Sequence, residues 1–246
     1  MQSREVAIER VDGGARAPAR DHVVVEAPLQ IRARGTPVAT IMRTPGHDLE
    51  LVSGLLWSEG IHGTPAQIDD DAVDVDVEAS AFAGRGLLAS AACGVCGRVA
   101  IADLELRAKE VAADTSIDHR VLAQLPDRLR AAQKVFGETG GLHAAGLFTA
   151  AGELVVVRED VGRHNAVDKV VGHALAAGIA PQVLVLSGRG GYELVQKAVM
   201  ARVPIVASVS APSSLAIELA ERFGVALAGF VRGDRANIYS HGWRIR

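Results

Sequence analysis

Short apolar runs separated by turn residues in the first third of the chain predict short β-strands. The stretches 22–33 and 38–44, separated by the turn sequence RGTP, predict a strand pair. Residues 44–60 have apolar positions at helical spacing and a terminal glycine, and therefore predict a helix. In 70–79, valines alternate with acids, which predicts an edge strand with its carboxylates facing water. We expect these elements to form a small β-rich unit.

The second half of the chain has a different pattern, in which short apolar runs alternate with amphipathic stretches. Residues 117–136 carry one apolar helical stripe, and from about residue 140 onward strands and helices follow each other. Buried strands joined by helices indicate a mainly parallel sheet with helices on its faces. The expected fold class is therefore α/β, or α+β overall. We expect a small β-rich domain over residues 1–115 and an α/β domain over residues 116–246.

Composition and charge restrict the possible partners. The 246 residues are 49% hydrophobic, which is enough for a substantial core, and the formal net charge is −3. A slightly acidic protein has no general attraction to nucleic acid or to an anionic membrane, so any anion site must be built locally. The sequence contains no apolar run of about 20 residues and does not begin with a secretory signal. We therefore expect a cytoplasmic protein with no nucleic-acid or membrane partner.

Cys93 and Cys96 are the only cysteines, and they end a stretch, 79–97, that consists largely of alanine, glycine and serine. In a reducing cytosol, a close pair of thiols more often takes part in a reaction or binds a metal than forms a structural disulfide. One C-x-x-C supplies only two of the four ligands of a structural zinc site, although a dimer could pool two pairs. A thioredoxin-like exchanger places its pair at a helix start, whereas small residues here predict a mobile loop. Such a loop suits a thiolate that carries sulfur between two partners.

Two strand-to-helix turns in the second half are candidate anion sites. The first contains Ser187, Gly188 and Arg189, and the second contains Ser210. Free backbone N–H groups and a guanidinium at such turns bind phosphate, and ligands of parallel sheets lie beyond the carboxyl ends of the strands. Steric turn glycines and helix-capping serines are the alternative interpretation.

Charged side chains are also dense after the strand that ends near residue 160. Arg163 and His164 lie in the sequence REDVGRHNAVDK, whose alternative interpretation is an exposed, charge-paired first helical turn. His143, flanked by small residues, is a further candidate, although a lone histidine is more often structural. Zinc nucleotide deaminases require H-x-E and a later P-C-x-x-C. Because Ala145 stands in place of that glutamate and no cysteine follows Cys96, the sequence argues against zinc deamination.

Several segments, taken in order along the chain, resemble the FdhD family of formate dehydrogenase accessory sulfurtransferases. They are EAPLQIRARGTPVATIMRTPGHDLELVSGLLWSEG, CGVCG, TGGLHAAGLF, REDVGRHNAVDKVVG, LSGR, SAPSSLAIELA and GFVRGDRANIY. The resemblance implies a C-terminal three-layer domain similar in fold to cytidine deaminases, without the zinc residues. It also implies a cytoplasmic homodimer and no permanently bound metal.

The resemblance further implies an activity. Sulfur would pass from a cysteine desulfurase, as a persulfide on Cys93, to the molybdenum or tungsten bis-guanine-dinucleotide cofactor that formate dehydrogenase requires. Cys96 would either relay the sulfur or expel it by closing a disulfide. A non-catalytic chaperone for the cofactor and a thiol–disulfide oxidoreductase are the alternative functions.

The resemblance also maps a cofactor-binding segment near the C-terminus. Its residues are Phe230, Val231, Arg232, Gly233, Asp234 and Arg235. We expect Arg189, Arg163, Arg232 and Arg235 to neutralise the pyrophosphates of the cofactor. The other residues expected to contact the cofactor are Ser187, Gly188, Ser210, His143 and His164.

Overall fold

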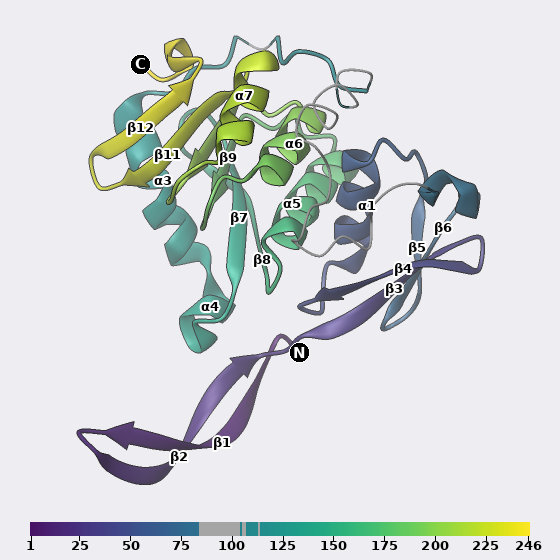
Figure 1. The fold of residues 1–246 in the computed structure, drawn as a ribbon, viewed down its shortest axis with the longest axis vertical. Coiled ribbons are helices and arrows are strands. Elements are labelled where there is room, and N and C mark those ends of the chain that lie inside the picture. Colours follow the sequence, from purple (N-terminus) through teal and green to yellow (C-terminus); the bar gives the residue numbers. More distant parts are fainter. Residues whose placement is uncertain (84–103, 105–106, 113) are drawn as a thin grey trace.

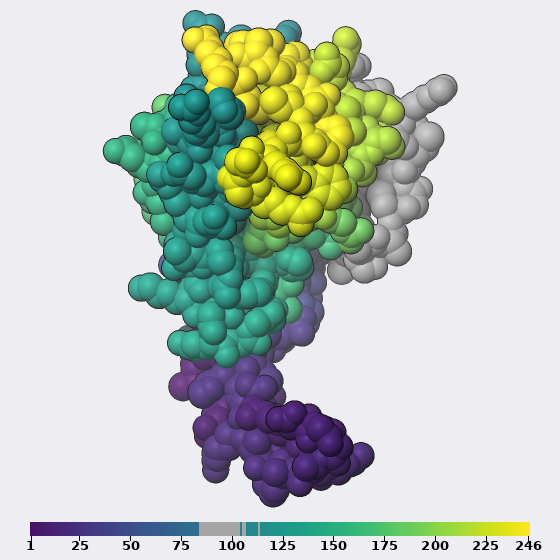
Figure 2. All heavy atoms as spheres, turned by 90° about the vertical axis from the view of Figure 1, so that its left-hand side faces the viewer, coloured from purple at the N-terminus to yellow at the C-terminus, as the bar shows by residue number. Residues whose placement is uncertain are grey.

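A β-hairpin at the start of the chain projects from the body of the protein (Figures 1 and 2). The computed structural model describes residues 1–83, 104, 107–112 and 114–246. Strands β1 (Ser3–Asp12) and β2 (Ala15–Val24) pair antiparallel along their whole length. Gly13 and Gly14 join them with φ of 56° and 88°, values that suit the two-residue turn of a twisted hairpin. The hydrophobic pattern did not predict this hairpin, and the strand predicted over 22–33 is in fact the end of β2 followed by β3 (Ala27–Ala33).

The second sheet has four strands in the order β4-β3-β6-β5. Its elements are β3 (Ala27–Ala33), β4 (Thr36–Arg43), β5 (Pro65–Asp69) and β6 (Ala72–Val75), with helix α1 (Asp48–Ser58) and the short helix η1 (Ala79–Phe82). Leu29, Ile31 and Val73 of this sheet share a buried core with Leu51 and Leu56 of α1. The expectation of an edge strand in 70–79 is wrong, because β5 covers the free side of β6.

The third sheet has six strands in the order β12-β11-β10-β9-β7-β8. They are β7 (His143–Phe148), β8 (Leu154–Asp160), β9 (Val183–Leu186), β10 (Ile205–Ser208), β11 (Ala226–Arg232) and β12 (Arg235–Ser240). The expectation of a mainly parallel sheet is wrong, because only β9, β10 and β11 pair parallel. The physical reason is that β7–β8 and β11–β12 are hairpins, and β7 lies between β8 and β9.

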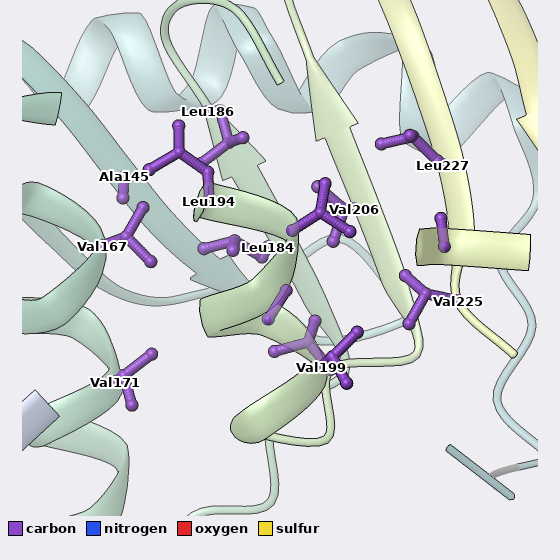
Figure 3. Close-up of a cluster of buried hydrophobic side chains, with 14 of the residues drawn as sticks. Ala145, Val167, Val171, Leu184, Leu186, Leu194, Val199, Val206, Val225 and Leu227 are labelled. Atoms are coloured by element: carbon purple, nitrogen blue, oxygen red, sulfur yellow. The ribbon is translucent and has the colours of Figure 1, made fainter. Parts of the chain in front are cut away.

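Helices cover both faces of this mixed sheet, which gives three layers (Figure 1). One face carries α3 (His119–Ala132), followed by α4 (Lys134–Thr139). The other face packs against α5 (Arg163–Ala177), α6 (Tyr192–Met200) and α7 (Ser214–Arg222), and Figure 3 shows its aliphatic core. The short helix η2 (Gly242–Arg244) follows β12. The single helix predicted over 117–136 is broken at Gln133, where the backbone leaves helical geometry with φ −78° and ψ 89°.

The division of the chain after residue 115 stays a prediction. Within the described residues, no helix has the length and apolar character needed to cross a membrane.

Helices α1 and α5 cross at backbone contact and thereby join the four-stranded and six-stranded sheets. A Cβ atom built on Gly54 would lie 2.0 Å from the carbonyl oxygen of Asp168, and one on Gly172 would lie 1.9 Å from that of Glu50. Only glycine fits at either position, because the obstructing atoms belong to backbone that cannot rotate away.

A half-buried ionic cluster stabilises the same junction. The Arg158 guanidinium of β8 donates to both carboxylate oxygens of Glu50 in α1, at 2.6 and 2.7 Å. His173 of α5 lies 2.9 Å from Glu50 Oε1. Burial would raise the pKa of Glu50, but the hydrogen bonds from Arg158 and His173 outweigh it, so the pKa falls below its usual 4.5.

We expect Gly172→Ala to destabilise the protein by about 3 kcal/mol, because the added methyl group forces α1 and α5 apart. Urea denaturation measures this difference. The matched control is Gly137→Ala in α4, where a Cβ atom meets nothing within 4 Å. Unchanged stability in Gly172→Ala would show that the helix crossing is adaptable.

We expect Arg158→Met to lower the free energy of unfolding at pH 7 by about 1–3 kcal/mol. A depressed carboxylate pKa stabilises the folded state above the unfolded pKa, so the deficit should shrink as the pH falls below 4.5. Denaturation at several pH values measures it. Arg16→Met, which breaks the exposed Arg16–Glu9 pair of the hairpin, is the control and should have little effect at any pH. A deficit that is independent of pH would contradict the electrostatic explanation.

Candidate functional site

The candidate site residues that the structure describes gather at one edge of the six-stranded sheet, the edge beside α4 in Figure 1. Strands β8, β9, β10 and β11 end at this edge, and β7 and β12 begin there. The topology therefore brings together segments that are far apart in the sequence: His143, Arg163–His164, Ser187–Arg189, Ser210 and Phe230–Arg235.

A groove of about 710 Å³ lies between this edge and the α3–α4 junction. Four predicted residues line its sheet side: His143, Ser187, Val231 and Arg232. The groove is lined in full by Pro126, Asp127, Leu129, Arg130, Gln133, Phe136, Gly140, Gly141, Leu142, His143, Ser187, Val209, Val231 and Arg232. Its volume falls in the range of small-molecule sites, and its mixed apolar and polar lining is typical of them.

The turn after β9 is tied to the start of β7. The backbone N–H of Ser187 donates to the Ala144 carbonyl at 3.0 Å, and the Ser187 hydroxyl accepts from the Ala144 N–H at 2.8 Å. Gly188 lies against the ring of His143, since an added Cβ atom would be 3.6 Å from its Nδ1. Arg189 extends into solvent.

The environment of His143 favours the neutral form of its ring, although much of its surface is open to solvent. Partial desolvation of the ring lowers its pKa from the usual 6.5, and the nearby positive charges of Arg163 and His164 lower it further. His143 therefore offers the groove a hydrogen-bonding ring without a charge.

The turn after β10 is bonded to the last part of β11 through Ser210. Its carbonyl oxygen accepts from the Ser208 hydroxyl at 2.8 Å and from the Phe230 N–H at 3.3 Å. Phe230 has a left-handed φ of 53°, at a register shift between β11 and β12. Beside this turn, the Ser213 hydroxyl accepts from the Ala216 N–H at 3.3 Å and caps α7.

The hairpin turn between β11 and β12 presents its charged side chains to water. Arg232, Gly233, Asp234 and Arg235 are all exposed, and Gly233 has the positive φ of 61° that the tight turn requires. Arg235 and Asp234 are 3.8 Å apart and almost fully exposed. An exposed pair of this kind is weak, so both arginines are available to an anion.

The carboxylate of Asp160 organises the loop between β8 and α5. It is fully buried, and one oxygen accepts from the Lys169 ammonium at 2.7 Å and from the Thr44 N–H at 3.1 Å. The other oxygen accepts from the Gly162 N–H at 2.8 Å and from the Asn165 amide at 2.9 Å. Part of the REDVGRHNAVDK segment therefore forms a hydrogen-bonded network around the buried Asp160 carboxylate. Arg163 and His164 lie between Gly162 and Asn165, two residues of this network.

His164 lines a second, smaller pocket of about 220 Å³ between α1, α5 and α6. Its Nε2 lies 2.9 Å from Glu193 Oε2, and this contact lowers the pKa of Glu193. Behind them, Lys197 donates to both oxygens of Asp168, at 2.7 and 2.8 Å. The structure thus places His164 beside the sheet edge but not in the lining of the large groove.

The α3–α4 side of the groove was not predicted from the sequence. Arg130 and Phe136 lie there with the Arg130 guanidinium carbon 4.2 Å from the centre of the Phe136 ring. The Glu159 carboxylate fixes the start of α4 by accepting from the N–H groups of Val135 and Phe136, at 3.0 and 2.7 Å. Gln133, between the two helices, is only 5% exposed. No motif marks these residues, because they belong to an amphipathic helix that the sequence predicted to be continuous.

Cys93 and Cys96, the predicted sulfur-carrying pair, lie outside the described residues. Among the residues that the structure does describe, no group of three or more histidine, cysteine, aspartate or glutamate side chains is arranged to hold a metal ion.

Comparison with known proteins gives a consistent result. Residues 24–246 match the model of the FdhD/NarQ family. The chain is 45% identical to the sulfur carrier protein FdhD of Streptomyces avermitilis, over 96% of this chain and 93% of that protein. It is 44% identical to the protein of the same name from Sulfolobus acidocaldarius, over 100% of this chain and 99% of the relative.

A solved structure supports the fold. It comes from Desulfotalea psychrophila, and its description provisionally calls it a formate dehydrogenase accessory protein. It superposes with a TM-score of 0.81 at 23% identity and covers both chains in full. Together, the matched family model and the near-full-length relatives show that this chain belongs to the FdhD/NarQ family.

Proposed function

We propose that this protein is a sulfur carrier and sulfurtransferase that serves formate dehydrogenase. The observation that carries the proposal is the near-full-length similarity to sulfur carrier proteins, in a chain whose only thiols form one C-x-x-C pair. In this proposal, Cys93 accepts sulfur from a cysteine desulfurase. The acceptor is the molybdenum or tungsten bis-guanine-dinucleotide cofactor, which is a substrate here and not a resident group.

The first step is an exchange in which no net oxidation occurs. The Cys93 thiolate attacks the outer sulfur of the desulfurase persulfide, the S–S bond of the donor breaks, and the donor cysteine leaves as a thiolate. The outer sulfur, now bonded to Cys93, is the one to be delivered. If Cys96 then attacks Cys93, a disulfide forms and the outer sulfur leaves as hydrosulfide.

The sheet edge supplies what a polyanionic acceptor needs. The protein carries a net charge of −3, so attraction to pyrophosphates must come from local cations. The groups we propose for this role are Arg232 and Arg235 on the exposed turn, Arg189 on a neighbouring loop and Arg163 at the start of α5. The groove between the edge and α3–α4 has room for the guanine end of the cofactor, beyond the phosphates.

The remaining parts of the proposal follow from the family. We propose a cytoplasmic homodimer whose partners are a cysteine desulfurase and formate dehydrogenase. We also propose that residues 116–246 form a cytidine deaminase-like domain. The three-layer arrangement supports this last point, and the buried alanine at position 145, where a zinc deaminase would need a glutamate, argues that such a domain does not carry out zinc deamination.

Incubation with a cysteine desulfurase and ³⁵S-labelled cysteine should label the protein, and dithiothreitol should release the label. Cys93→Ala should abolish labelling because the accepting thiolate is absent, whereas Cys96→Ala should keep it. If Cys93→Ala still supports an active formate dehydrogenase, the protein is a cofactor chaperone. Reduction of insulin that requires both cysteines would instead indicate a thiol–disulfide oxidoreductase.

The double substitution Arg232→Ala and Arg235→Ala should weaken binding of guanosine diphosphate by about tenfold or more, because two charge-assisted contacts to phosphate are lost. Isothermal titration calorimetry measures the affinity, and its dependence on salt should decrease in the variant. Arg120→Ala, which removes an exposed arginine near the far end of α3, is the control. Equal affinity in the wild type and the double variant would exclude this turn as the phosphate site.

A further inference from the structure

Gln133 has a buried polar group without a hydrogen-bond partner. The side chain is 5% exposed, and its Nε2 has no acceptor within the part of the chain that the structure describes. A desolvated amide N–H that makes no hydrogen bond costs free energy, and such groups in native proteins are rare. Gln133 is one of the residues that line the large groove, so a rotation of its side chain toward the groove brings this buried N–H group to an acceptor there.

The break between α3 and α4 puts this amide at the groove. Helix α3 ends at Ala132, Gln133 leaves helical geometry, and α4 starts at Lys134. If the helix had continued, as the sequence predicted, residue 133 would lie on the apolar stripe of α3, four residues after Leu129. The break is held by the Glu159 carboxylate, which accepts from two N–H groups at the start of α4.

The neighbours of Gln133 define the shape and polarity of the ligand. Phe136 and the Arg130 guanidinium, 4.2 Å apart, form a flat, π-rich surface on the same wall. Asp127, one of the groove residues on α3, offers a carboxylate acceptor. Across the groove, Arg232 supplies a positive charge. A planar base with a carbonyl acceptor beside N–H donors, joined to phosphate, matches this set.

Among the common purines, guanine has this pattern. Its O6 accepts a hydrogen bond and its N2 amino group donates, whereas adenine presents a donor at position 6. From the orphaned amide and the flat wall beside it, we infer that Gln133 selects the guanine base by donating a hydrogen bond to its O6. The inference rests on the proposed function, because it assumes that the guanine-dinucleotide end of the acceptor is what enters the groove.

The test compares the affinities of guanosine, inosine and adenosine diphosphates for the wild type and Gln133→Met by isothermal titration calorimetry. Methionine fills a similar volume but has no N–H donor. Guanosine and inosine diphosphates both carry O6, so both should bind about tenfold more weakly to the variant, and adenosine diphosphate should be unaffected. Gln124→Met, the same substitution at an exposed position of α3, is the control and should change none of the three.

A second measurement separates ligand recognition from a structural role. Because Gln133→Met removes a buried unsatisfied group, the ligand-free variant should melt about 2–4 °C higher than the wild type. A structural glutamine would instead give a lower Tm and an unchanged preference for guanine over adenine, which would overturn the inference.

The remaining outcomes distinguish the inference from the proposed function. If guanosine diphosphate binds with the same affinity to Gln133→Met but loses affinity in the Arg232 and Arg235 variant, the inference is wrong and the phosphate site stands. If the wild type does not bind guanosine diphosphate, the inference is also wrong. Sulfur transfer is then tested on its own, by the ³⁵S labelling of Cys93.

Discussion

The buried carboxylate of Asp160 is the interaction on which the site depends. It accepts hydrogen bonds from the backbone of the β4–α1 connection, from the backbone before α5 and from two side chains of α5. Four donors surround one desolvated carboxylate, and a buried polar group that loses its hydrogen bond raises the free energy of the folded state. The loop therefore has a single low-energy arrangement. Asp160 also pairs with His143 across the β7–β8 ladder, so its position sets where the sheet edge begins.

Much of the edge could be predicted from the sequence, because the turns after buried strands carry visible chemistry. Ser187, Gly188, Arg232 and Arg235 follow apolar runs, and any open sheet with this alternation of strands and helices brings such turns to one edge. The directions of the strands were harder to predict from the sequence. Apolar runs look alike in parallel and antiparallel neighbours, so the insertion of β7 between β8 and β9 has no local signature.

The opposite wall of the groove could not be predicted from the sequence, for a different reason. The apolar stripe of 117–136 continues through Gln133, and no proline or glycine marks the break. Its cause is tertiary: Glu159, from a strand more than twenty residues away, supplies the capping oxygens for α4. Local propensity cannot report a cap that comes from another element. The hairpin β1–β2, in contrast, had a local signal in Asp12-Gly13-Gly14, which the low apolar content of its strands obscured.

That hairpin differs energetically from the rest of the fold. Two strands cannot enclose a core, and most of its side chains are exposed, including those of the cross-strand pairs Glu5–Arg20 and Glu9–Arg16. Its backbone hydrogen bonds therefore open by local fraying at low free-energy cost, while those of β9 and β10 open only with global unfolding. Amide hydrogens of one molecule would then exchange on two separate time scales, with the boundary near Val24, where the arm meets the body.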